Sequence, residues 1–154
     1  MKKEAMQRLM MLTIALTTLG GCGSSPHEAD EKYVLIANNT KVPYWQAAIA
    51  GLNRAGTQMN VKTEVAGPEN YDPKVQHEEF QKVLRGKPSG ILVSAGDSKL
   101  SESDINAAIA QGIPVITVDS DVETSKRLFF IGTDNYKAGS IGGRIVAQQL
   151  HGKG

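Results

Sequence analysis

The sequence is poor in the residues and motifs that serve catalysis and cofactor binding. Its 154 residues include one cysteine, so no internal disulfide bond can form. The three histidines, His27, His77 and His151, lack metal-ligand spacing, and we expect each on the solvated surface. Neither a G-x-S-x-G turn nor a G-x-x-x-x-G-K-[ST] phosphate loop occurs, and no G-x-G-x-x-G follows a predicted strand. These absences argue against an enzyme, a resident metal and a cofactor.

Blocks of like charge are also absent. The chain has 17 basic and 16 acidic residues. Residues 1–21 hold three of the basic residues and one acidic residue, so 14 basic and 15 acidic residues follow them, a net charge of −1. Because nucleic-acid binding calls for a basic face, this balance argues against nucleic acid as a partner.

The longest apolar run lies near the N-terminus and is short. Residues 9–19 are apolar apart from threonines, and they follow a start that contains two lysines and an arginine. A membrane-spanning helix needs about 20 apolar residues. A basic start, a short apolar run and small residues are instead typical of a secretory signal peptide, here over residues 1–21. A buried N-terminal helix is the alternative interpretation.

The single cysteine closes this segment. Cys22 follows Leu-Gly-Gly, a pattern that resembles a bacterial lipobox, in which the cysteine receives a diacylglyceryl group and becomes the first residue. We therefore expect a lipid anchor through Cys22 and a location at the extracytoplasmic or periplasmic face of the cell envelope. A secreted protein with a free thiol is the alternative. Residues 22–32 combine Gly, Ser, Pro and charge without an apolar period, which predicts a flexible tether.

The remainder, residues 33–154, alternates short apolar runs with helical patterns. Strands are predicted to begin near residues 33, 61, 90, 113 and 128. Helices are expected over 43–59, from Pro73 after an Asp72 cap, from a capping-box-like start at Ser101, and from Asp134 or Asn135 to about Leu150. In the last helix, apolar residues are expected to face inward: Ala138, Ile141, Ile145 and Val146. The pattern predicts an α/β fold, a three-layer open parallel sheet of order 2-1-3-4-5 with helices on both faces.

Ligands of such sheets bind at the carboxyl ends of the strands. Tyr44 and Trp45 stand where the first strand gives way to a helix, and their rings suit the apolar face of a sugar. Asp119 directly follows the fourth strand, and a carboxylate there accepts two hydroxyls at once. The alternatives are core packing for Trp45 and a loop cap for Asp119.

Four motifs in this order carry a family resemblance: Asn39…Pro43-Tyr44-Trp45, GILVSAGDS, GIPVITVDSD and IGTDNYKAG. The chain resembles the N-terminal lobe of periplasmic sugar-binding proteins of ABC importers, of the ribose/galactose type (type I periplasmic binding proteins). The resemblance implies these ligand-binding residues: Asn38, Tyr44, Trp45, Ser94, Asp119 and Thr133. Val42 and Ser120 stand where ribose-type members have Asn and Arg, which argues against ribose itself.

The resemblance also implies a second lobe, so we expect residues 33–154 to be one sugar-binding lobe without its C-terminal partner, from a fragment or a truncated gene. The implied function is that of a substrate-binding lipoprotein that binds a monosaccharide or similar polyol and delivers it to an ABC permease. The alternative is a sensing protein that presents the sugar to a chemoreceptor or sensor kinase.

Overall fold

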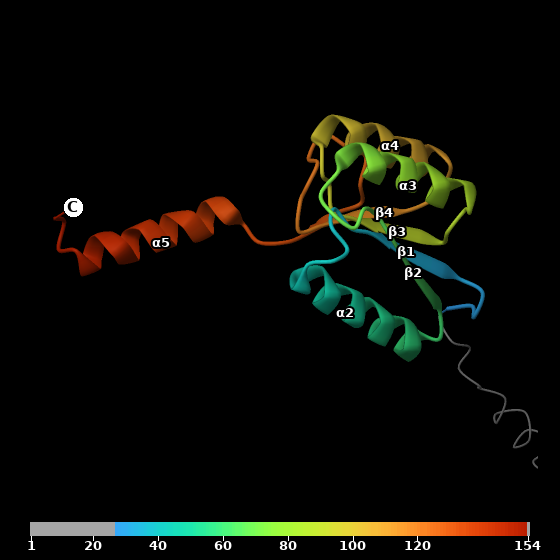
Figure 1. Cartoon of the computed structure of the whole chain (residues 1–154), viewed down its shortest axis with the longest axis horizontal. Helices are drawn as coiled ribbons and strands as arrows, with labels where there is room; N and C mark the ends of the chain where they lie inside the picture. Colours follow the sequence, from blue (N-terminus) through green and yellow to red (C-terminus); the bar gives the residue numbers. More distant parts are fainter. Residues whose placement is uncertain (1–26, 154) are drawn as a thin grey trace, which may run out of the picture.

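In a computed structural model that describes residues 27–153, the centre of the protein is one parallel sheet (Figure 1). Its strands are β1 (Lys32–Ile36), β2 (Lys62–Ala66), β3 (Gly90–Val93), β4 (Val115–Val118) and β5 (Phe130–Ile131). Their order is β2-β1-β3-β4-β5 and every neighbouring pair is parallel, which confirms the predicted topology. The predicted signal peptide and Cys22 lie outside the described residues.

Helices cover both faces of the sheet, as predicted. They are α2 (Pro43–Met59), α3 (Pro73–Arg85) and α4 (Ser98–Ala110), whereas α5 (Asn135–Gln149) follows β5 and has no buried residue. The pair α3 and α4 lies on one face and α2 lies on the other (Figure 1). Because all the strands are parallel, the loops that follow β1, β3, β4 and β5 lie at the same edge of the sheet.

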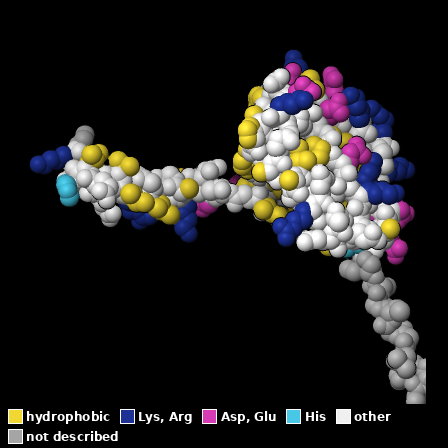
Figure 2. Space-filling view, turned by 60° about the horizontal axis from the view of Figure 1, so that its bottom comes forward, with side chains coloured by type: hydrophobic (Ala, Val, Ile, Leu, Met, Phe, Trp, Pro, Cys, Tyr) yellow, Lys and Arg dark blue, Asp and Glu magenta, His cyan; other side chains and the backbone are white. Residues whose placement is uncertain are grey.

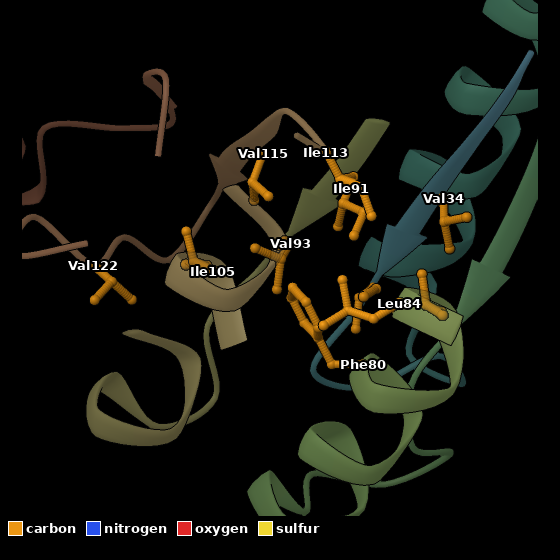
Figure 3. Packing of buried hydrophobic residues seen from close by; sticks show 12 residues of the cluster. Val34, Phe80, Leu84, Ile91, Val93, Ile105, Ile113, Val115 and Val122 are labelled. Atoms are coloured by element: carbon orange, nitrogen blue, oxygen red, sulfur yellow. The ribbon is translucent and has the colours of Figure 1, made fainter. Parts of the chain in front are cut away.

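Two apolar clusters hold the layers together. The larger one lies between the sheet and the α3–α4 pair, where Phe80 and Ile105 pack on Val93 and Val115 (Figure 3). The smaller one joins Leu35 of β1 and the following Ala37 to Trp45 in the first turn of α2. β1 therefore contributes side chains to both clusters, which is why its sequence is a continuous apolar run and not an alternating one.

The start of α4 differs from the prediction. The helix begins at Ser98, three residues before the expected capping box, because the Asp97 carboxylate accepts from the N–H groups of Lys99 and Leu100. Ser101 and Asp104 consequently lie inside the helix and are buried. The Asp104 carboxylate accepts from Gln81 and lies 2.8 Å from His77 Nδ1, so His77 is paired and not simply solvated.

The position of α5 also contradicts the prediction. Asp134 caps the helix as expected, but the helix extends away from the sheet (Figure 1), and Figure 2 shows apolar side chains along its surface. Ile141, Ile145 and Val146 are 42–57% exposed and no residue of α5 is buried. Helical periodicity identifies an apolar face, but it does not specify which surface covers that face.

Smaller differences concern element ends. β4 begins at Val115 because the Ile113 N–H still bonds to Ala108 O in the turn that ends α4. At the predicted tether, residues 27–31 form a turn in which Glu31 accepts from Tyr33. Among residues 27–153, no helix is both long enough and apolar enough to cross a membrane.

Candidate functional site

A groove of about 480 Å³ lies between α2 and the face of the sheet, and one end of it reaches the carboxyl ends of β4 and β5. Apolar side chains form its floor, contributed by Leu35, Leu52, Leu92 and Val118. Polar atoms gather at one end, where Tyr44, Asp119 and Thr133 line it. An apolar surface that ends in a few polar groups is the usual character of a small-molecule site.

Asp119 holds the polar end of the groove. Its N–H donates to Ile131 O at 2.9 Å, which extends the β4–β5 ladder by one residue. Its φ of 64° lies in the left-handed region, which non-glycine residues seldom adopt. The exposed carboxylate accepts from the Tyr44 hydroxyl at 2.8 Å and from Ser94 Oγ at 3.4 Å.

The hydrogen bonds continue from Ser94 into the interior. Asn38 Nδ2 donates to Ser94 Oγ at 3.4 Å, and Asn38 Oδ1 accepts from Trp45 Nε1 at 2.8 Å. Five of the six predicted ligand-binding residues thus form one chain of hydrogen bonds drawn from three loops. Thr133, the sixth, lines the groove with Tyr44 and Asp119.

The two aromatic residues have different environments. Tyr44 is 60% exposed, whereas Trp45 is 4% exposed and packs on Leu35 and Ala37. Their rings lie 5.3 Å apart and perpendicular, at 88°. Tyr44 therefore offers the open aromatic surface. The predicted core-packing alternative describes the surroundings of Trp45, and its contact with a ligand stays a prediction.

The Tyr44 hydroxyl is kept as a donor. Its hydrogen bond to the Asp119 carboxylate raises the pKa of Tyr44 above the ordinary value, because the phenolate would face a negative charge. At neutral pH one oxygen of Asp119 is thus engaged by Tyr44, and the carboxylate retains acceptor capacity for a ligand hydroxyl.

Sequence reasoning missed Gln76, which supports the site from behind. Its side chain is 4% exposed; Nε2 donates to Ser94 O at 2.8 Å and Oε1 accepts from Gly96 N at 2.9 Å. These two bonds fix the loop that carries Ser94. Its position could have been predicted from helical spacing, because Gln76 lies four residues before Phe80 and seven before Val83, on the buried side of α3.

Within residues 27–153, no group of three His, Cys, Asp or Glu side chains could hold a metal ion.

The periplasmic binding protein domain family matches residues 33–154, most of the chain. The chain belongs to this family. Its members are binding proteins and not enzymes, as the sequence predicts, and the family indicates an extracytoplasmic location. The order of the strands and the placement of three helices on two faces agree with an N-terminal lobe of such a protein.

Individual relatives of this periplasmic binding protein domain are sugar-binding proteins. The ribose import binding protein RbsB of Bacillus subtilis (strain 168) is 23% identical over 94% of this chain and 50% of its own length. AraP, an arabinose-binding protein from Geobacillus stearothermophilus, is 35% identical with a TM-score of 0.71, over 79% of this chain and 42% of that one.

A third relative was solved with its ligand. The ABC transporter solute-binding protein of Burkholderia graminis C4D1M, in complex with D-arabinose, has a TM-score of 0.78 and 28% identity, over 83% of this chain and 44% of that one. The chain therefore spans about half the length of the relatives it matches.

Proposed function

We propose that this chain forms the ligand-binding rim of a substrate-binding lipoprotein of an ABC-type sugar importer, whose ligand is a monosaccharide of the pentose class and whose partner is a membrane permease. Relatives with ribose, arabinose and D-arabinose in their names support the ligand class. The lipobox-like segment before Cys22 supports an anchor in the envelope.

One observation carries the proposal: an exposed carboxylate and an exposed aromatic ring meet at the end of an apolar groove. The two oxygens of Asp119 have room for adjacent sugar hydroxyls beside the bond from Tyr44. The ring of Tyr44 presents an apolar face to the C–H groups of a sugar. Ser94 is fully buried, and its hydroxyl bonds to both Asp119 and Asn38, so these two residues support the Asp119 carboxylate from behind.

The affinity expected of the 154-residue chain is low. The residues at the polar end of the groove, Tyr44, Asp119 and Thr133, are exposed to water. Ligand hydroxyls that bond to the protein there replace bonds to water, so each bond nets only about 1 kcal/mol. A few such bonds give about −4 kcal/mol, a dissociation constant of roughly 1 mM. In a longer protein that closes over the ligand, binding should be much tighter, and Trp45→Ala or Asp119→Ala should each abolish that gain.

Titration with arabinose and ribose, followed by NMR, tests the proposal. With arabinose we expect saturable shifts at Tyr44 and Asp119 in the millimolar range, and their loss in Asp119→Asn. With ribose the shifts should be weaker, because Val42 and Ser120 replace two of its hydroxyl partners. Asn tolerates left-handed backbone, so this variant removes the charge without straining the turn. Glu64→Gln is the control, because Glu64 pairs with Lys32 at the amino end of the sheet. Equal shifts in the wild type and Asp119→Asn, or none with either sugar, would refute the assignment.

A further inference from the structure

The chain makes an unusual turn directly after β4. Ser120 N–H donates to Val118 O at 2.7 Å, which closes a three-residue turn with Asp119 at its centre. The φ of Asp119 is 64°. Three-residue turns with positive φ at the centre are rare and strained, and such a conformation persists only where the surroundings enforce it. The contacts around this turn must therefore supply the constraint.

Asp121 supplies a tie across the turn. Thr117, the buried residue that precedes Val118, donates from Oγ1 to Asp121 Oδ1 at 2.6 Å. This bond links the strand on one side of Asp119 to the loop on the other, so it closes a ring around the turn. Asp119 stands at the apex of the ring, midway between Thr117 and Asp121.

Arg127 fixes the carboxylate that makes this tie. Its Nη2 donates to Asp121 Oδ2 at 2.6 Å and its Nε donates to Oδ1 at 2.5 Å, a two-pronged contact that sets the plane of the carboxylate. The two side chains are only 17% and 19% exposed, so solvent screens the pair weakly. The pair also joins both ends of the loop between β4 and β5.

Two further backbone bonds hold the flanks of the turn. Asp119 N–H bonds to Ile131 O and Ala95 N–H bonds to Ser120 O, at 2.9 and 3.3 Å. Both bonds anchor the flanking peptide groups to neighbouring strands or loops. The Thr117–Asp121 bond is different from these two, because it spans Asp119 and encloses the Ser120–Val118 bond that closes the turn.

We propose that Asp121, held by Thr117 and Arg127, is a positioning residue that keeps Asp119 in its left-handed conformation and so directs the Asp119 carboxylate toward Tyr44 and the groove. The consequence for ligand binding rests on the proposed function, whereas the effect on Asp119 itself does not. Asp121 acts through the backbone and makes no contact with the ligand in this assignment.

The test compares Asp121→Ala with Glu64→Ala in the 154-residue chain, each of which removes the carboxylate of an ion pair. Scalar couplings report the φ of Asp119, and titration of ring-labelled tyrosines reports the Tyr44–Asp119 bond, with Tyr44→Phe identifying the signal. In Asp121→Ala we expect Asp119 to leave the left-handed region and the pKa of Tyr44 to fall toward the ordinary value of a tyrosine. Glu64→Ala should change neither.

A folded Asp121→Ala variant with unchanged couplings and an unchanged Tyr44 midpoint would overturn the proposal. If Asp121→Ala does not fold, Thr117→Val decides the question, because valine fills the space of threonine without its hydroxyl; the same two readouts should move. Titration of the wild type with arabinose tests the proposed function separately from the role of Asp121. If the wild type does not bind the sugar, the proposed function fails, while the couplings still decide the role of Asp121.

Discussion

Replacing Asn38 by alanine removes the partner of a buried indole and gives a stability change that the structure predicts. Trp45 is 4% exposed and its Nε1–H donates to Asn38 Oδ1 at 2.8 Å. Among residues 27–153, every buried side-chain nitrogen or oxygen has a hydrogen-bond partner, so Asn38→Ala creates the first unpaired one. Leaving a buried donor unpaired costs about 1–3 kcal/mol.

The lower half of that range applies, because Asn38 is only half-buried and water can reach part of the vacated space. We therefore expect a loss of about 1–2 kcal/mol in the free energy of unfolding. With a urea dependence of about 2 kcal/mol per molar, the midpoint should fall by about 0.5–1 M. The assay is urea unfolding followed by fluorescence, since Trp45 is the only tryptophan of the chain.

Asn39→Ala is the matched control. Asn39 Oδ1 accepts from the N–H groups of Lys41 and Val42, but these contacts are exposed and water replaces them, so the loss should be at most about 0.5 kcal/mol. Asn38→Ala should also shift the Trp45 emission to the red, as water approaches the indole. Equal midpoints for the two variants, with unchanged emission, would show that the Trp45–Asn38 bond does not stabilise the fold.

Three further predictions concern other parts of the chain. Burial raises the pKa of Asp121, but hydrogen bonds from Arg127, Thr117 and the Val122 N–H outweigh burial and hold the pKa below the usual range. The stabilising contribution of Asp121 should therefore be complete at neutral pH and be lost as pH falls through the folded-state pKa. Urea unfolding at a series of pH values should show this acid-side loss in the wild type and not in Asp121→Asn. Labelled fatty acid should enter the wild type in cells but not Cys22→Ser, and equal labelling would refute the anchor. Phe80→Ala should lower the free energy of unfolding by about 3–5 kcal/mol, since Phe80 is 1% exposed, and a loss under about 1 kcal/mol would contradict the packing described.

The sequence predicts the sheet well because its central strands, β1 and β3, are largely buried. A run such as Val34–Leu35–Ile36 has few alternatives to a central parallel strand, and the intervening helical patterns then determine the order of the strands. The same reasoning places Asp119 at the carboxyl end of β4, because a charged residue cannot continue the buried run. The residue at which a buried strand ends can thus be predicted from the change from apolar to charged side chains.

Features that depend on contacts between residues of different elements could not be predicted from the sequence. The start of α4 depends on which of two acidic residues reaches free backbone N–H groups, and Asp97 does so while Asp104 is engaged by α3. The direction of α5 depends on tertiary contacts that its own periodicity does not specify. Trp45 lines the groove, but its indole N–H points inward and donates to Asn38. The sequence pattern does not indicate this hydrogen bond.

The left-handed backbone at Asp119 limits how this protein can acquire a new ligand preference. Glycine, asparagine and aspartate reach a φ of 64° at low cost, whereas bulkier or branched residues do not. The residue best placed to accept ligand hydroxyls is thus among the least replaceable in the rim. Variation in ligand choice among descendants of this sequence should accordingly accumulate at groove-lining neighbours with ordinary backbone, such as Tyr44 and Thr133, around an unchanging acidic centre.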